Sequence, residues 1–196
     1  MVQGGGCGRL CHGWRVATDE READRRGRFE ELARELIDPL RRFLARRTDP
    51  ATADDVLSDT LLVCWRRLDD VPQEALPWAY GVARNCLANA QRAERRRERL
   101  AARISIVAPP DQTTPTPSER DDELLEAMAA LRPEDAELLR LWAWEQLTPA
   151  QIATVLQVSP NAAGIRLHRA REKLREELRK VRQVSGHEQS REGRGS

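Results

Sequence analysis

The chain has 196 residues, which is enough for one medium domain or two small ones. Charged residues make up 33% of the sequence and aromatic residues only 4%, a composition that favours small helical domains with aliphatic cores and argues against a β-sandwich. The formal net charge is +1, so the total charge indicates no partner, and only the distribution of charge along the chain can do so.

The first 28 residues are rich in glycine and then in charge, without helical periodicity, and we expect a disordered N-terminal extension over residues 1–28. Cys7, Cys11 and His12 lie close together there, but no fourth ligand follows at a spacing typical of a metal site. We therefore expect no metal and no other cofactor. The chain has neither a hydrophobic signal core nor an apolar run long enough to span a bilayer, so we expect a cytoplasmic protein without direct membrane insertion.

Apolar residues at helical spacing predict three helices in the first half of the chain, over about residues 29–44, 52–68 and 77–97. Thr52 followed by Asp55 resembles a capping box, so we expect Thr52 to cap the second of these helices. Together the three helices predict a first domain over residues 29–102.

Four prolines crowd into Ala108–Ser118, and this composition predicts a flexible linker over residues 103–121. Helical periodicity resumes after it and predicts a second domain over residues 122–182, followed by a disordered polar tail over 183–196. No segment has the alternating pattern of a strand. The predicted fold class is therefore all-α: two small helical domains, a helical bundle and a helix-turn-helix, joined by a Pro-rich linker.

A helix-turn-helix is predicted from Thr148 to Arg175. Thr148 before Pro149, and Ser159 before Pro160, can each cap a helix whose first residue is proline. The pattern predicts that the second helix turns these residues inward: Ile165, Ala170, Leu174 and Leu178. A helix that is basic elsewhere can lie in the major groove of DNA and place arginine near guanine or phosphate. The alternative is an ordinary helical hairpin with a solvated basic face.

Two further stretches carry candidate binding residues. The helix that begins near Asp54 has acidic residues around an apolar seam, a face suited to docking on a basic protein surface, unless it is simply solvated. Trp78 and Tyr80 precede Arg84 and Asn85, and aromatic rings beside amides and arginine can stack on unpaired bases and bind their edges. The alternative is that Trp78 is a core residue, and we expect one of the two rings to pack inward.

Three segments in this order resemble the extracytoplasmic-function (ECF) group of bacterial sigma-70-type sigma factors. They are Asp54–Arg66, Pro77–Asn85 and Leu147–Leu174, and the resemblance extends over residues 29–182. It implies a subunit without catalytic residues that directs RNA polymerase to promoters and is controlled by a stress or another signal.

The resemblance also implies partners and site residues. The partners are bacterial core RNA polymerase, through its clamp and flap, promoter DNA, and an anti-sigma factor; the chain itself is expected to be a monomer. The implied polymerase-binding residues are Asp54, Asp55, Ser58, Asp59, Leu62, Trp65 and Arg66. The residues implied for the −10 element and its melting are Trp78, Tyr80, Arg84, Asn85, Asn89, Arg92, Arg95 and Arg96, behind a base-capture loop at residues 71–76. The residues implied for the −35 element are Asn161, Arg166, His168, Arg169 and Lys173.

One position departs from the family pattern. Gly164 stands in the predicted recognition helix where relatives often have a basic residue, and glycine inside a helix costs about 1 kcal/mol relative to alanine. The promoter sequence therefore cannot be carried over from the family. The competing hypothesis is a stand-alone helix-turn-helix regulator whose first domain dimerises or binds a ligand; such a regulator has no need of Trp78, Tyr80 and Asn85 beside a basic helix.

Overall fold

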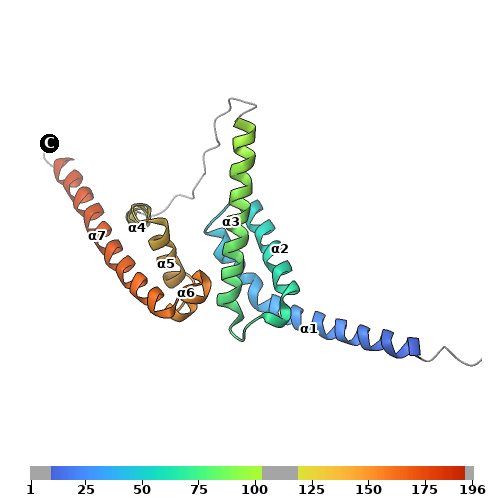
Figure 1. Ribbon diagram of the computed structural model, residues 1–196. Coiled ribbons are helices and arrows are strands. Elements are labelled where there is room, and N and C mark those ends of the chain that lie inside the picture. Colours follow the sequence, from blue (N-terminus) through green and yellow to red (C-terminus); the bar gives the residue numbers. More distant parts are fainter. Residues whose placement is uncertain (1–9, 103–118, 193–196) are drawn as a thin grey trace, which may run out of the picture. The chain divides into compact units, whose positions relative to one another are not determined.

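The computed structural model describes the backbone of residues 10–102 and 119–192, and every regular element in these ranges is helical, as predicted. Contacts divide the chain into two compact units, Met1–Ala93 and Glu94–Ser196, so that the division falls within α3. The elements, labelled in Figure 1, are α1 (Leu10–Ala45), α2 (Pro50–Arg66), the 3-10 turn η1 (Leu68–Asp70), α3 (Ala75–Ala102), α4 (Glu119–Ala129), α5 (Pro133–Ala143), α6 (Pro149–Leu156) and α7 (Pro160–Glu192). Of the linker expected over residues 103–121, residues 103–118 lie outside the described residues, whereas residues 119–121 belong to α4.

The core of the N-terminal unit is built where α1, α2 and α3 meet. Phe43 of α1 is fully buried, and its ring centroid lies 4.9 Å from that of Tyr80 on α3. Cys64 of α2 is also fully buried, and burial raises the pKa of its thiol to about 11, so that it stays protonated and behaves as a small apolar side chain. The core side chains of this unit are Leu36, Leu40, Phe43, Leu44, Val56, Leu57, Thr60, Cys64, Leu68, Ala79, Tyr80, Ala83 and Leu87.

Helix α2 begins two residues earlier than predicted, and Asp49 rather than Thr52 caps it. The backbone N–H of Thr52 donates to Oδ1 of Asp49 at 3.0 Å, and Pro50 takes the first helical position, where its missing N–H costs nothing. The same hydrogen bond lowers the pKa of Asp49, because it favours the charged carboxylate. This contribution to stability is present above the ordinary pKa of an aspartate and is lost as the pH falls through the lowered pKa of Asp49.

Helices α1 and α7 extend into both segments that were expected to be disordered. Residues 10–28 belong to α1, and α7 continues past residue 182 to Glu192, whereas residues 1–9 and 193–196 lie outside the described part. The reason at the N-terminal end is visible in the sequence, because Glu20–Ala23 are good helix formers, and in the structure, where Arg25 packs on α2. Periodicity alone missed this helix because charged residues dominate the sequence from Asp19 to Arg28.

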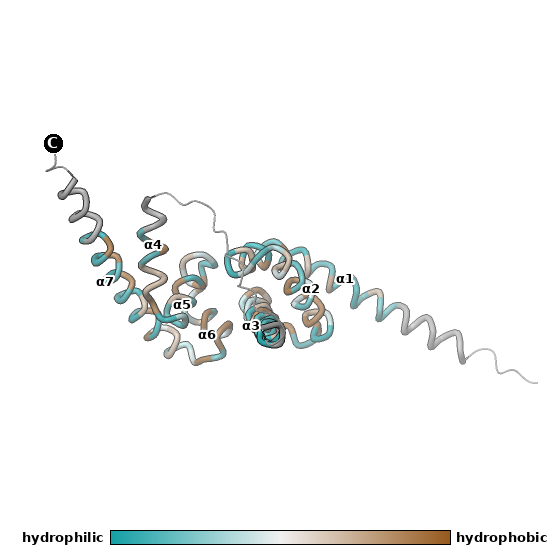
Figure 2. The backbone as a smooth tube through the Cα atoms, turned by 90° about the horizontal axis from the view of Figure 1, so that it is seen from above, coloured by the Kyte–Doolittle hydropathy of each residue, from teal (hydrophilic) through white to brown (hydrophobic). Residues whose placement is uncertain are grey.

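The C-terminal unit packs α4, α5 and α6 against α7. Figure 2 shows apolar residues along α6, and Leu141 of α5 and Ile152 of α6 are fully buried. The predicted caps are confirmed at both helices of the helix-turn-helix. Thr148 and Gln151 form a complete capping box at α6, and the Ala162 N–H donates to Oγ of Ser159 at 3.2 Å at the start of α7.

Replacing Thr148 with alanine is expected to lower the free energy of unfolding by about 1 kcal/mol, because the N–H of Gln151 then loses its side-chain acceptor. Urea denaturation followed by circular dichroism measures the change. Thr154→Ala is the matched control on the same helix, since Oγ1 of Thr154 donates only to the carbonyl of Ala150, at 3.4 Å. Equal losses in the two variants would contradict a stabilising role for the capping box.

Candidate nucleic-acid interface

In the second helix of the helix-turn-helix, three of the residues predicted to turn inward are buried or half-buried, Ala170, Leu174 and Leu178, and only Ile165 is on the wrong face. Leu167 and Ala170 of α7 are buried together with Ala163, whereas Ile165, expected inside, is 46% exposed. The spacing from 163 to 167 to 170 follows the helical repeat, but residues 165 and 170 lie about 140° apart around the axis and cannot share one face. Leu167 was the residue that sequence reasoning missed, and the repeat of three and four residues was the signal that could have found it.

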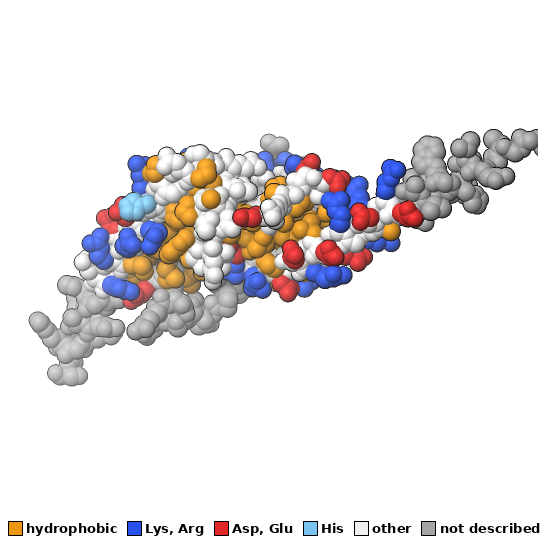
Figure 3. Space-filling view, turned by 90° about the horizontal axis from the view of Figure 1, so that it is seen from below, with side chains coloured by type: hydrophobic (Ala, Val, Ile, Leu, Met, Phe, Trp, Pro, Cys, Tyr) orange, Lys and Arg blue, Asp and Glu red, His pale blue; other side chains and the backbone are white. Residues whose placement is uncertain are grey.

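The face of α7 opposite this core carries Asn161, Ile165, His168 and Arg169, all of them exposed. Figure 3 shows basic side chains gathered around the exposed histidine of α7. Within the described part of the chain Arg169 has no ion-pair partner, whereas Nε2 of His168 lies 3.4 Å from Oε1 of Glu172. The exposed face thus combines an amide, a branched apolar side chain and a guanidinium, groups that can read base edges in a major groove.

Two cations of α7 hold the helix against α5. Nζ of Lys173 lies 2.5 Å from Oδ2 of Asp135, and the guanidinium of Arg171 lies 4.5 Å from the ring centroid of Trp142. Arg166 is exposed on the same flank as Lys173. Lys173, predicted as a DNA contact, is therefore already engaged within its own unit and orients α7 there.

Gly164 lies in open space. A β-carbon built on it would meet nothing within 4 Å, and its backbone has an ordinary helical conformation. Packing within the unit therefore does not require a glycine at this position.

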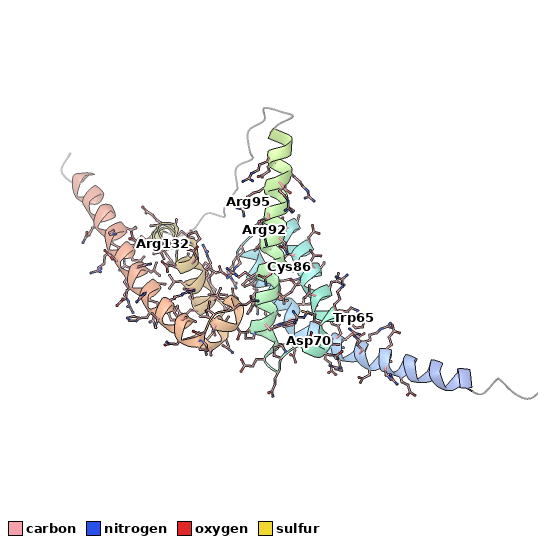
Figure 4. The ribbon with its side chains drawn as sticks, viewed as in Figure 1. Trp65, Asp70, Cys86, Arg92, Arg95 and Arg132 are labelled. Atoms are coloured by element: carbon pink, nitrogen blue, oxygen red, sulfur yellow. The ribbon has the colours of Figure 1, made fainter. Side chains whose placement is uncertain are left out.

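Helix α3 carries the second predicted set of DNA-binding residues. In the structure these residues lie on different sides of the helix. Trp78 is half-buried, and Asn85, Asn89 and Arg92 are exposed. These four residues and Arg96 recur at helical spacing on the face opposite the core, whereas Arg84 and Arg95 are exposed on another side. Figure 4 shows Arg92 and Arg95 farther along α3 than Cys86.

Tyr80 is the exception in this set. It is only 3% exposed and packs against Phe43, so it cannot stack on a base in this conformation. The expectation that one of the two aromatic rings packs inward is confirmed, and it is Tyr80. Trp78 keeps part of its ring accessible, with the guanidinium of Arg67 5.8 Å from the ring centroid.

Part of the Asn89 and Arg92 pair is already committed to internal hydrogen bonds. Arg92 donates from Nη2 to Oδ1 of Asn89 at 2.7 Å and from Nε to the carbonyl of Ala88 at 3.1 Å. The amide nitrogen of Asn89 is thereby turned away from Arg92, where it can serve as a donor.

The outward face of α2 brings together most of the predicted polymerase-binding residues. Leu62 is 44% exposed, and five predicted polar residues of α2 are exposed around the same seam: Asp54, Asp55, Ser58, Asp59 and Arg66. Trp65 differs from them because α1 partly covers it. Phe29 meets its ring edge-on with centroids 5.3 Å apart, and Arg25 lies 4.9 Å from the ring centroid. Trp65 therefore joins α1 to α2, a role that the sequence did not reveal.

Sequence reasoning also missed four exposed apolar side chains on the C-terminal unit. Four large apolar side chains of α4, α5 and the residue after α5 are between 38% and 48% exposed: Leu124, Leu125, Trp142 and Trp144. Exposed apolar groups of this size are typical of a protein-binding surface. No pattern marked them as exposed, because each also fits a helical core repeat.

Among the described residues, no group of three or more histidine, cysteine or acidic side chains is placed to hold a metal ion. Cys7 lies outside the described residues, as do the side chains of Cys11 and His12. Within the described ranges no helix combines the length and the apolarity that crossing a membrane requires.

Two family models match this chain, in the order of its two units. The model described as Sigma-70 region 2 matches residues 29–97, and the model described as Sigma-70, region 4 matches residues 121–174.

Named relatives agree with these matches. The chain is 33% identical over 147 residues to the probable RNA polymerase sigma factor RfaY of Xanthomonas campestris, an alignment that covers 69% of this chain but only 36% of that protein. It is 31% identical over 157 residues to the RNA polymerase sigma factor CarQ of Myxococcus xanthus, covering 76% of this chain and 88% of CarQ. It is 30% identical over 146 residues to the ECF RNA polymerase sigma factor SigL of Mycobacterium tuberculosis, with 71% and 82% covered.

Solved structures share the fold. The sigma factor RpoE of Bartonella quintana, determined in complex with the anti-sigma factor NepR, has a TM-score of 0.56 at 19% identity and covers 77% of this chain and 96% of its own. CnrH, determined in complex with the cytosolic domain of CnrY, has a TM-score of 0.51 at 23% identity, with 78% and 88% covered.

Proposed function

The chain belongs to the sigma-70 family of RNA polymerase sigma factors, in its ECF group, and from this premise we propose how its exposed faces divide the work of promoter recognition. A sigma factor combines with bacterial core RNA polymerase, directs it to promoter DNA and supports the start of transcription. The observation that carries the proposal is that the two matched regions each expose a face suited to one part of that task.

The outward face of α2 docks on the polymerase clamp in this proposal. Its exposed leucine at position 62 lies among carboxylates, a serine and an arginine, which is the arrangement of an apolar centre with a polar rim. The carboxylates of Asp55 and Asp59 favour a basic partner surface.

The outer face of α3 receives the unpaired strand of the −10 element. Trp78 supplies a partly accessible ring on which a base can stack, and Asn85 supplies an amide for a base edge. Arg92, Arg95 and Arg96 follow along the helix and bind phosphates, which adds affinity without sequence information. Tyr80 supports this face from the core.

The exposed face of α7 reads the −35 element as a duplex. Asn161, His168 and Arg169 face the groove, with Arg166 on the flank towards the phosphates. Lys173 acts through its pair with Asp135, which fixes the helix on α5.

We further propose that an anti-sigma factor controls this chain, that it acts in the cytoplasm as a monomer, and that it catalyses no reaction of its own. The anti-sigma proposal is supported by the solved complex of RpoE with NepR and by four exposed apolar side chains of the C-terminal unit: Leu124, Leu125, Trp142 and Trp144. The same side chains are also available to the polymerase flap.

Run-off transcription tests the function directly. The chain added to core polymerase is expected to yield transcripts from a subset of a randomised promoter library, whereas the chain alone, or core alone, yields none. Sequencing the transcribed templates reveals the −35 and −10 elements. A chain that binds duplex DNA tightly without polymerase, and yields no transcript with it, would instead be the stand-alone regulator.

A further inference from the structure

The end of α2 is capped by an arginine that lies 40 residues earlier in the chain. The carbonyl of Trp65 is one of the last four carbonyls of α2, for which the helix itself offers no N–H donor. Nη2 of Arg25 donates a hydrogen bond to this carbonyl at 2.9 Å. The guanidinium also lies over the ring of Trp65, and a cation at this end of a helix is favoured by the helix dipole. Arg25 therefore fixes the point at which the chain leaves α2.

Two more arginines hold the turn that follows. Nη1 of Arg28 lies 3.1 Å from Oδ1 of Asp69, and Nε of Arg67 lies 3.4 Å from Oδ2 of Asp70. We call Arg25, Arg28 and Arg67 the arginine brace. Figure 4 shows Trp65 and Asp70, to which the brace is attached, at the same end of the N-terminal unit.

The braced turn leads directly into the loop before α3. Residues 71–74 separate η1 from α3, and Trp78 lies in the first turn of that helix. Arg67 links the two sides, since it is paired with Asp70 and lies over the ring of Trp78. A displacement of η1 is thereby transmitted to the place where an unpaired base is proposed to bind.

Charge gives the brace a second effect. The turn and loop carry three carboxylates, at Asp69, Asp70 and Glu74, in a region proposed to approach phosphates. Two of these carboxylates are compensated by Arg28 and Arg67. Without that compensation they would repel the strand that the loop must accept.

Two of the three residues of the brace lie outside the family match. The region 2 model begins at residue 29, so Arg25 and Arg28 lie before it, on the part of α1 that sequence analysis expected to be disordered. The segment upstream of the matched region therefore makes specific contacts with the promoter-facing turn.

We propose that Arg25 and Arg28 support promoter opening in two ways: Arg25 positions the turn after α2, and Arg28 neutralises the carboxylate of Asp69 there, so that an unpaired base of the −10 strand is received at Trp78. This rests on the proposed function of the α3 face. Neither arginine needs to touch DNA.

A charge-removal cycle on the exposed pair tests the proposal. The holoenzyme is titrated with a fluorescent single-stranded oligonucleotide that carries the non-template strand of the −10 element found in the promoter library. Arg28→Gln is expected to weaken binding about three- to fivefold, in the range of one surface ion pair. Asp69→Asn is expected to leave binding unchanged or tighter, and the double variant to return to the wild-type affinity.

Arg34→Gln is the matched control. Arg34 is paired with Glu30 on the same helix, and its substitution removes the same charge from the chain. A double variant as weak as Arg28→Gln would mean that Arg28 touches the strand itself, and an equal loss in Arg34→Gln would mean that net charge alone matters. Either result overturns the proposal.

Arg25 is tested by its conservative variant. Arg25→Gln is expected to weaken binding of the oligonucleotide about tenfold, near the lower end of the range for one hydrogen bond from a charged donor, and Arg25→Lys is expected to recover part of that loss. Binding to core polymerase is expected to stay at the wild-type value in both. A wild-type holoenzyme that fails to initiate refutes the proposed function, whereas full initiation and oligonucleotide binding by the Arg25 and Arg28 variants refute the brace alone.

Discussion

Leu62→Asp is expected to abolish assembly with core polymerase while the chain stays folded. Leu62 is 44% exposed at the centre of the outward face of α2, so an aspartate there meets water in the free chain and costs little. In the complex the same carboxylate would be buried without a partner. An uncompensated buried charge costs about 3–5 kcal/mol, which corresponds to a loss of affinity of more than 100-fold.

The measurement is a titration of labelled core polymerase, with thermal denaturation of the free variant to establish that it is folded. Ile165→Asp is the matched control, since Ile165 is a branched apolar residue of similar size that is 46% exposed on α7. It is expected to bind core polymerase normally and to lose the −35 duplex. Wild-type affinity of Leu62→Asp for the polymerase would remove the α2 face from the proposed interface.

The reciprocal design matters because both substitutions place a carboxylate on an exposed apolar site. If the two variants lose the same activity, the loss reflects a general effect of the added charge. If each loses a different partner, the two exposed faces have separate functions.

Local signals in the sequence predicted the parts of the fold that depend on neighbouring residues. The caps at Thr148 and Ser159 are of this kind, because each needs only a hydroxyl before a proline and a free N–H within the next three residues. The cap of α2 shows the limit. Asp49 and Thr52 both have suitable side chains, and the choice depends on whether Pro50 starts the helix or ends the preceding segment.

Local signals in the sequence could not predict contacts between distant segments. The inward turn of Tyr80, rather than Trp78, depends on Phe43, which lies 37 positions earlier in the printed sequence. Trp65 shows the same limit, since its cover is provided by Arg25 and Phe29 of α1. Residues whose role depends on a partner far along the chain require the three-dimensional structure.

On α7 the sequence predicted the exposed charged side chains more completely than the apolar side chains that pack in the core. Arg166 and Arg169 are exposed, as a basic recognition helix requires, because burial of an unpaired guanidinium is prohibitive at any register. Ile165 of α7 was misassigned because an isoleucine fits the core and an exposed groove-reading face equally well. Only the register set by Ala163, Leu167 and Ala170 decides between them.

Arg169→Ala is expected to weaken binding of the holoenzyme to the −35 duplex by about 10- to 100-fold, the range for one arginine that reads a base edge with two hydrogen bonds. Arg169 is exposed on the same face of α7 as Ile165 and has no ion-pair partner among the described residues, so its removal leaves the fold intact. Binding to core polymerase and to the unpaired −10 strand is expected to remain unchanged. Arg132→Ala, an exposed arginine at the cap of α5, is the matched control.

A third substitution separates reading from positioning on the same helix. Lys173→Ala and Asp135→Asn both break the pair that holds α7 on α5, so a positioning role predicts the same loss of −35 affinity in both. If Lys173 instead binds phosphate, Asp135→Asn releases the cation and strengthens binding, while Lys173→Ala weakens it at every duplex sequence alike. Arg169→Ala differs from both, because it alone is expected to relax the preference for one base pair of the −35 element. A uniform loss across all duplex sequences in Arg169→Ala would assign Arg169 to the phosphates and leave base reading to Asn161, Ile165 and His168.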